Sequence, residues 1–239
     1  SNITDFQIRM FGKRTYELFY QRYQGFFISN SEDVDSSYNG ANKIKRADIE
    51  TRSYGLNFAW NFNDKNFSPQ VAFAQMGQQK KSDWSWMMFT SLSDFEVQGE
   101  TALVPSTVKS DFGRIGSLQH IKTQSFSMGL GLGGIAAWEG LYITALIGVG
   151  GGAQITTAQF EGLADEKNTQ GSSVSMFRIG LGYNGEKHIL AANYWGDSVG
   201  ISVGDGRFIS SITQFSLYYG YKFSDVNVPI ANQISALFD

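Results

Sequence analysis

The dominant pattern along this chain is an alternation of apolar residues with small or polar ones. Over residues 54–62 every second position is aromatic or leucine, and the positions between them are small or polar. The same pattern recurs over 125–133, 177–183 and 214–223. Side chains alternate between the two faces of a strand, whereas the apolar face of a helix repeats about every 3.6 residues. The pattern therefore predicts strands with one apolar face.

The same alternation, followed along the whole chain, gives about ten expected strands, with boundaries good to about two to four residues. They lie at 5–11, 15–29, 47–62, 67–79, 82–97, 118–135, 140–156, 173–185, 188–203 and 207–223. Several exceed the roughly 9–11 residues that a tilted strand needs to cross the hydrocarbon of a bilayer, whereas ordinary strands average about five or six. The sequence predicts an all-β fold over 1–223, a transmembrane antiparallel up-and-down β-barrel of about 10 strands, within a range of about 8–12.

The connections between these strands agree with a barrel in all but one place. With both termini in the periplasm, 98–117 and 157–172 are expected to be long outer loops, and 137–140 and 184–187 short periplasmic turns. Residues 30–46 do not fit, because they would form a long periplasmic loop.

The period of two stops after Phe223. Residues 224–239 contain Pro229 followed by spaced apolar residues, which predicts a short amphipathic helix with proline in its first turn. We expect this tail to plug the lumen, to lie at the inner membrane face, or to contact a neighbouring subunit.

Composition narrows the functional classes. The chain has 27 glycines, 15% aromatic residues and only 3 prolines, a balance that suits strands and membrane interfaces. It has no cysteine, which excludes disulfides and thiolate metal sites, and a net charge of −3, which argues against a nucleic-acid partner. A mean hydropathy of −0.21 resembles that of soluble proteins, but barrel strands average lipid-facing and lumen-facing residues. No cofactor or metal is expected.

Aromatic residues gather near the expected strand ends, as in the aromatic belts of membrane barrels. They are Trp60, Trp84, Trp86, Trp138, Trp195, Tyr219 and Tyr221. The alternative is that they are core aromatics of a soluble β-protein. The predicted lipid or interface residues are Trp60, Trp84, Trp86, Met88, Phe89, Trp138, Leu217, Tyr219, Tyr221 and Phe223.

The stretch 84–89 is apolar on both faces of its strand, which a strand lining a water channel should not be. If one face meets lipid, the other meets a packed lumen, another subunit, or more lipid. Polar residues expected on the lumen side are Asn57, Asn61, Arg178 and Gln214.

Three other signals are weak. Residues 140–160 form an uncharged run long enough for a membrane helix, but they are rich in glycine and keep the period of two. A nucleotide-binding glycine motif must lie between a strand and a helix. The glycines of 129–134 and 148–153 lie inside expected strands instead. His120 and His188 have no metal-ligand spacing, although histidine-dependent catalysis on lipids stays open as an alternative.

Part of the chain resembles a known family. Residues 67–75 and 79–82, together with 23–27 and 103–105, resemble the PopA-like, porin-like outer-membrane proteins of Gram-negative bacteria, predatory species included, which are long carried as a domain of unknown function. The similarity covers about a third of the chain, from Tyr23 to Pro105. At residues 83–86 this chain departs from the small residues that the family tends to have.

The resemblance implies an integral barrel of the bacterial outer membrane that forms a ring-shaped homo-oligomer, with a pentamer favoured, and that holds membrane lipid. The sequence therefore predicts a non-catalytic, porin-like barrel that self-associates and binds or traps lipid. The alternatives are a passive diffusion channel for small solutes and, ranked last, an outer-membrane enzyme acting on lipids.

Overall fold

A computed structural model shows nine antiparallel strands in a single sheet, and their order in space follows their order along the chain. The structure describes residues 2–10, 12–35, 40, 43–203 and 206–223. The strands are β1 (Asn2–Met10), β2 (Arg14–Phe27), β3 (Lys45–Asn61), β4 (Asp83–Gln98), β5 (Leu118–Trp138), β6 (Leu141–Phe160), β7 (Glu166–Asn184), β8 (His188–Val203) and β9 (Gly206–Tyr221). The helices are α1 (Ser31–Val34), α2 (Pro69–Phe73) and the 3₁₀ helix η1 (Lys109–Ser117).

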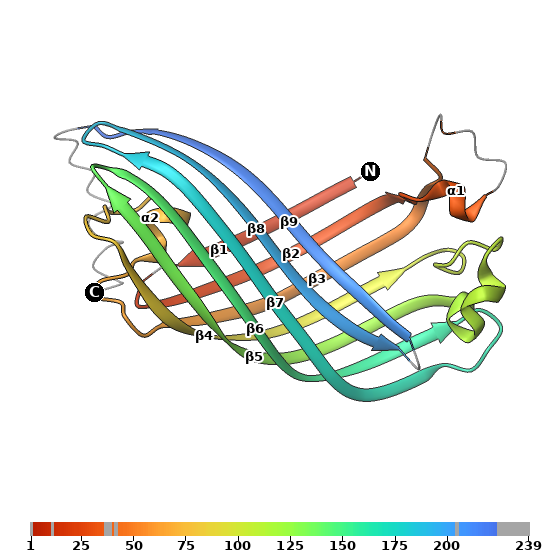
Figure 1. The fold of residues 1–239 in the computed structure, drawn as a ribbon. Coiled ribbons are helices and arrows are strands. Elements are labelled where there is room, and N and C mark those ends of the chain that lie inside the picture. The colour runs from red at the N-terminus through yellow and green to blue at the C-terminus, as the bar shows by residue number, and fades with distance from the viewer. Residues whose placement is uncertain (1, 11, 36–39, 41–42, 204–205, 224–239) are drawn as a thin grey trace.

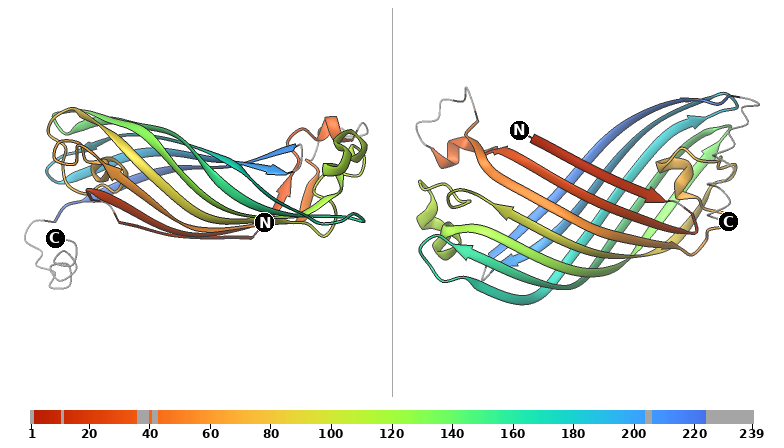
Figure 2. Two further views of the ribbon diagram at one scale, coloured as in Figure 1. Left: turned by 90° about the horizontal axis from the view of Figure 1, so that it is seen from below. Right: turned by 180° about the vertical axis from the view of Figure 1, so that it is seen from behind.

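The sheet is strongly twisted and curls into a half-barrel, with β1–β3 on one wall and β7–β9 on the wall that faces it (Figures 1 and 2). Within the described residues no backbone ladder joins β1 to β9. The predicted all-β, up-and-down antiparallel fold is confirmed, and the nine strands fall within the predicted range. Among these residues no helix has both the length and the apolar character needed to cross a bilayer.

Nine of the ten expected strands form, and the predicted strand at 67–79 is wrong. These residues form α2 and the loop after it, and Phe67, Val71 and Phe73 are buried inside the curl of the sheet. Pro69 stands in the first turn of α2, where its missing N–H costs nothing and its fixed φ favours a helix.

The missing strand also corrects the expected placement of residues 30–46. The connection that contains α1 lies at the same end of the sheet as η1 and as the β6–β7 connection (Figure 1). Only two strands, β3 and β4, separate it from η1, so the chain returns to the same end. Arg46, at the start of β3, contacts the connection that leads to η1. Its guanidinium nitrogens donate to the carbonyl oxygens of Leu103 and Ala102 at 3.0 and 2.9 Å.

The opposite end of the sheet carries the short turns at 138–141 and 184–188 and the segment that contains α2 (Figure 1). The start of β1 and the end of β9 lie at opposite ends, so the expectation that both ends of the strand array share one side is wrong for the described strands. The predicted helix in 224–239 lies outside the described residues.

Candidate functional site: the outer face and the filled lumen

The outer face of the sheet carries a continuous band of exposed apolar side chains, which we call the outer band. Its clearest row is Leu18, Leu56, Leu92 and Phe126, which are register partners across β2–β5 and are all exposed. Further large exposed members include Phe6, Ile8, Met10, Tyr16, Tyr54, Trp84, Trp86, Met128, Leu130, Leu132, Trp138, Leu141, Ile143, Ile147, Val149, Phe177, Leu181, Tyr183, Leu190, Tyr194, Phe215, Leu217, Tyr219 and Tyr221. A monomer in water rarely exposes so large an apolar surface.

Most of the predicted interface residues lie on this face. Those exposed there are Trp84, Trp86, Trp138, Leu217, Tyr219, Tyr221 and, just past β9, Phe223. Trp60 and Met88 are half-buried register partners on the same face. Trp84 and Trp86 pack edge to face, with ring centroids 6.5 Å apart.

Two of the aromatic residues face inward and not toward the outer band. Phe89 points inward and is only 5% exposed, because its odd position places it opposite to Met88. Its ring fills the space beside Gly148, where an added Cβ would lie 2.8 Å from Phe89 Cε1. Trp195 also faces inward, so it belongs to no belt on the outer face.

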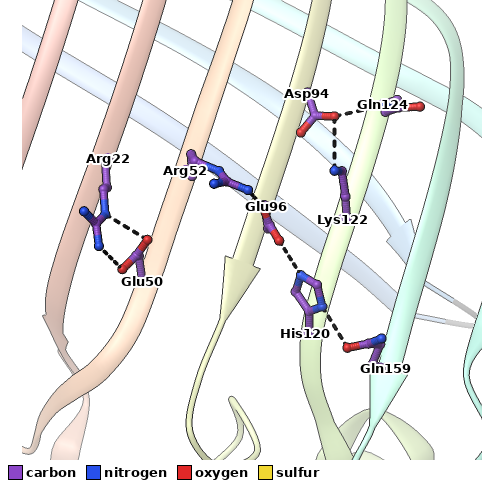
Figure 3. A network of polar contacts seen from close by, with 9 residues as sticks. All are labelled: Arg22, Glu50, Arg52, Asp94, Glu96, His120, Lys122, Gln124 and Gln159. Atoms are coloured by element: carbon purple, nitrogen blue, oxygen red, sulfur yellow. Dashed lines mark hydrogen bonds and ion pairs between the residues drawn. The ribbon is translucent and has the colours of Figure 1, made fainter.

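A group of charged and polar side chains, which we call the polar belt, lies beyond the outer band toward the long connections. Figure 3 shows its members, which come from β2 to β6. They are Arg22, Glu50, Arg52, Asp94, Glu96, His120, Lys122, Gln124 and Gln159.

The belt is aligned with the outer band by strand register. Arg22, Arg52, Glu96 and Lys122 form one row of partners across β2–β5. This row lies four residues along each strand from the row of Leu18, Leu56, Leu92 and Phe126, and between the two rows lie Tyr20, Tyr54, Asp94 and Gln124. The outer face thus passes from apolar to fully charged within four residues.

Each belt cation is paired with a carboxylate of a neighbouring strand. Arg22 donates to Glu50 from Nε and Nη2 at 2.9 and 2.8 Å. Arg52 bonds Glu96 from Nη2. Charge-assisted hydrogen bonds of this kind are about twice as strong as neutral ones.

These contacts keep the carboxylates ionised. The hydrogen bond from Arg22 lowers the pKa of Glu50 below its ordinary value. Burial raises the pKa of Glu96, but the hydrogen bonds with His120 and Arg52 outweigh it and leave a lowered pKa. Both carboxylates lie beyond the outer band, toward the long connections.

The two histidines sit on the outer face among polar and aromatic partners. His120 Nε2 lies 2.8 Å from Glu96 Oε1, and its Nδ1 lies 2.9 Å from Gln159 Oε1. His188 Nδ1 lies 3.2 Å from the hydroxyl of Tyr219. Within the described chain neither ring contacts a serine hydroxyl, so these contacts give a serine hydrolase no support.

The concave side of the half-barrel is filled from the α2 end by part of residues 62–82, which we call the plug segment; its buried residues include Phe67, Val71, Ala72 and Phe73. Phe67, Ala72 and Phe73 pack with Met87, Ile135, Tyr142, Leu146 and Trp195 in one buried apolar cluster. The apolar inner face of residues 84–89 therefore meets a packed lumen, which is one of the three expected explanations.

Amide side chains of the wall hold the plug segment by its backbone. Asn61 Nδ2 donates to Phe67 O at 2.7 Å, Asn193 Nδ2 to Ala72 O at 3.1 Å, and Asn184 Nδ2 to Gly77 O at 2.7 Å. The inward direction predicted for Asn57, Asn61, Arg178 and Gln214 is confirmed. Sequence patterns carry no signal for what Asn61 binds.

A second apolar cluster fills the concave side of the half-barrel toward the long connections. Its members are Val97, Leu118, Ile121, Ala158, Phe160, Ile201 and Val203. Between the two clusters a chamber of about 190 Å³ remains, and it holds two ion pairs, Arg9 with Glu17 and Arg178 with Asp197. The interior is therefore a packed core around a small charged chamber.

A meandering antiparallel sheet with an apolar outer face and a filled inner face defines a β-barrel-like protein. The chain belongs to a family described as a domain of unknown function, DUF4421, whose model matches residues 1–223. No curated protein matches the chain. Since the family description states no activity, the resemblance to PopA-like proteins stays a prediction.

Proposed function

We propose that this protein is an integral, non-catalytic β-barrel of a bacterial outer membrane, embedded through the outer band. The single observation that carries the proposal is the continuity of that band across the strands, ending at a charged row in strict register. Soluble monomers rarely expose so large an apolar surface to water, whereas lipid tails solvate such a surface.

The height of the band suits a bilayer. On β5 the outward apolar positions run from Phe126 to Trp138, twelve residue steps. At about 3.3 Å per residue and a tilt of about 45°, this corresponds to about 28 Å, close to the roughly 25 Å apolar band of outer-membrane barrels. The edge of the outer band at the α2 end of the sheet carries Trp138, Tyr219 and Tyr221. Amphipathic rings of this kind favour the headgroup layer of a bilayer.

The filled lumen favours a structural or lipid-organising role over a diffusion channel. The plug segment and the second apolar cluster stand between the chamber and the two ends of the sheet. A porin needs a continuous water-filled path, whereas small barrels have interiors filled by side chains. The ring-shaped homo-oligomer that traps lipid, with five subunits favoured, remains the prediction of the resemblance.

The test is membrane extraction followed by labelling of single cysteines, which the cysteine-free chain permits. The protein should stay in the membrane pellet after a urea wash. A polarity-sensitive label at Leu130→Cys on the outer band should report hydrocarbon, whereas the same label at Lys81→Cys, an exposed position near the end of the plug segment, should report water. A protein that is monodisperse in buffer without detergent, with both labels in water, would overturn the proposal.

A further inference from the structure

We propose that Arg22, Arg52 and Lys122 of the polar belt form a binding site for the phosphate group of an anionic membrane lipid. This inference rests on the proposed function, because it places the outer band in hydrocarbon. It adds the chemical class of the lipid and the side chains that recognise it.

The position of the belt corresponds to the headgroup layer. Its charged row lies four residues beyond the row of Leu18 and Leu56, a height of about 9 Å for strands tilted by about 45°. The headgroup and interfacial region of a bilayer extends about 5–8 Å beyond the hydrocarbon on each side, so the row of Tyr20, Tyr54, Asp94 and Gln124 lies within this region and the charged row lies at its outer boundary. Tyr20 and Tyr54 lie between the two rows, at the depth that tyrosine prefers.

The cations of the belt face outward and their carboxylates lie beneath them. The side chains of Arg22, Arg52 and Lys122 are 50%, 43% and 42% exposed. Those of their partners Glu50, Glu96 and Asp94 are 17%, 14% and 7% exposed. Although the formal charges balance, the surface that an approaching lipid meets is therefore positive.

The two arginines are placed to act together. Arg22 and Arg52 are direct register partners on the outer face of β2 and β3, and directly opposed side chains have Cβ atoms about 4.5–5.5 Å apart. Two like charges so close are unfavourable unless anions surround them. The half-buried carboxylates of Glu50 and Glu96 provide part of this compensation from below, and a phosphate would complete it from above.

Both guanidinium groups also keep donors to offer. Within the described residues, Arg22 uses Nε and Nη2 for Glu50, and Arg52 uses Nη2 for Glu96. This leaves Nη1 of Arg22 and both Nε and Nη1 of Arg52 for an external acceptor. Guanidinium donors match the oxygen geometry of a phosphate. Lys122 Nζ, 3.9 Å from Asp94 Oδ2, adds a point charge at the other end of the row.

The occupant is a lipid and not a soluble anion because only one row of residues, Tyr20, Tyr54, Asp94 and Gln124, separates the site from the outer band. The exposed Leu18, Leu56, Leu92 and Phe126 provide a surface for acyl chains four residues along the strands from the cations. Anionic lipids attract Lys and Arg side chains that lie at a membrane surface. Strand register continues the row from Lys122 through Thr157 of β6 to the exposed Lys167 of β7, which adds a cation at the same height.

The experiment is a native mass-spectrometry titration of the full chain in detergent with dipalmitoyl phosphatidic acid and with dipalmitoyl phosphatidylcholine. The variant R22Q/R52Q should weaken phosphatidic acid binding by roughly tenfold or more. The matched variant K80Q/K81Q, which removes the same charge from the exposed loop after α2, should bind as the parent does. Phosphatidylcholine binding should be similar in all three proteins.

A second variant distinguishes loss of the lipid site from loss of folding. E50Q/E96Q keeps both guanidinium groups but removes the carboxylates beneath them, so it should bind phosphatidic acid at least as tightly as the parent. Failure of both double variants to bind either lipid would assign the belt a structural role and overturn the inference. Unchanged phosphatidic acid binding by R22Q/R52Q would also overturn it.

Competition with inorganic phosphate separates the two sources of the phosphate group. Millimolar inorganic phosphate that leaves phosphatidic acid bound supports a lipid site. Inorganic phosphate that binds equally well and displaces the lipid would show a free-anion site and contradict the lipid assignment. A protein that is soluble without detergent would instead overturn the proposed membrane function, so the two failures are distinguishable.

Discussion

The guanidinium carbon of Arg9 in β1 lies 3.8 Å from the ring centroid of Trp195 in β8, across the curl of the sheet. Arg178 covers the same ring with its guanidinium carbon 4.6 Å from the centroid. Trp195 thus stands between two cations and joins the two walls of the chamber. Cation–π contacts of this kind contribute most where water is excluded.

We expect Trp195→Ala to destabilise the fold by about 3–5 kcal/mol, because it removes a buried ring and leaves two guanidinium groups without it. Urea unfolding of the detergent-solubilised protein, followed by circular dichroism, measures the free energy of unfolding. Trp195→Phe keeps an aromatic ring and should cost distinctly less. Equal costs for the two substitutions would contradict the role of the ring.

The plug segment should loosen when its backbone acceptors lose their donors. The double variant Asn61→Ala and Asn184→Ala leaves Phe67 O and Gly77 O without these partners, at a cost of about 1–3 kcal/mol each. Limited proteolysis should then cut within 62–82 faster than in the parent. Asn168→Ala, at the far end of β7, is the control. Unchanged cleavage within 62–82 would show that apolar packing alone holds the plug segment.

The parent protein should be silent in single-channel recordings across planar bilayers, because its lumen is packed. Replacing 66–80 by a short glycine-serine linker should leave the recordings silent as long as the variant still folds by circular dichroism, because the second apolar cluster still fills the end toward the long connections. Steady conductance through the parent protein would favour the diffusion channel instead.

The facing of β9 can be tested with one charge. Arginine at Leu217, an outer-band residue that is 74% exposed, should cost roughly 2–4 kcal/mol in a bilayer. Arginine at Gln214, which lines the same chamber as Asp197, should cost much less because a carboxylate is available to pair with it. Folding titrations into lipid vesicles compare the two. Similar losses at both positions would invalidate the assignment of faces.

The ion pair between Arg46 and Asp48 should make the long-connection end sensitive to acid. Arg46 donates to Asp48 at 2.9 and 2.8 Å, and this hydrogen bond lowers the pKa of Asp48. A carboxylate with a lowered pKa contributes stability that is complete above its unfolded pKa of about 3.9 and is lost as the pH falls through the folded value.

Hydrogen exchange of residues 99–105 should therefore accelerate below about pH 4 in the parent, because Arg46 also holds Leu103 and Ala102. In Asp48→Asn this acid step should be missing. An identical acid response in both proteins would place its cause in other carboxylates.

Local pattern is sufficient to predict the strands and their faces. The alternation over 54–62 and 214–223 places Tyr54, Leu56 and Leu217 on the outer face, where the structure has them. The α2 segment resembles a strand in sequence because its apolar residues are buried on all sides, which erases the helical period in so short a run. Ser68 followed by Pro69 is the available signal for a helix start.

The polar belt cannot be predicted from the pattern. Its charged row depends on which residues of different strands are register partners. Register shifts at Gln24/Phe26 and Leu118/His120 change the pairing that would be obtained by counting residues from the connections. The chamber is equally nonlocal, since Arg9 and Trp195 are brought together only by the curl of the whole sheet. Only the three-dimensional pairing reveals that Arg22 faces Arg52.

The two outermost strands have a topological consequence. In a meander of nine antiparallel strands, β1 and β9 run in the same direction. Hydrocarbon does not accept an open sheet edge, because each unsatisfied backbone group there costs several kcal/mol. Direct joining of these edges would need a parallel ladder, whereas antiparallel closure needs an odd number of added strands. Antiparallel closure through strands on the β1 side would also return the polypeptide to the end of the barrel where β9 finishes.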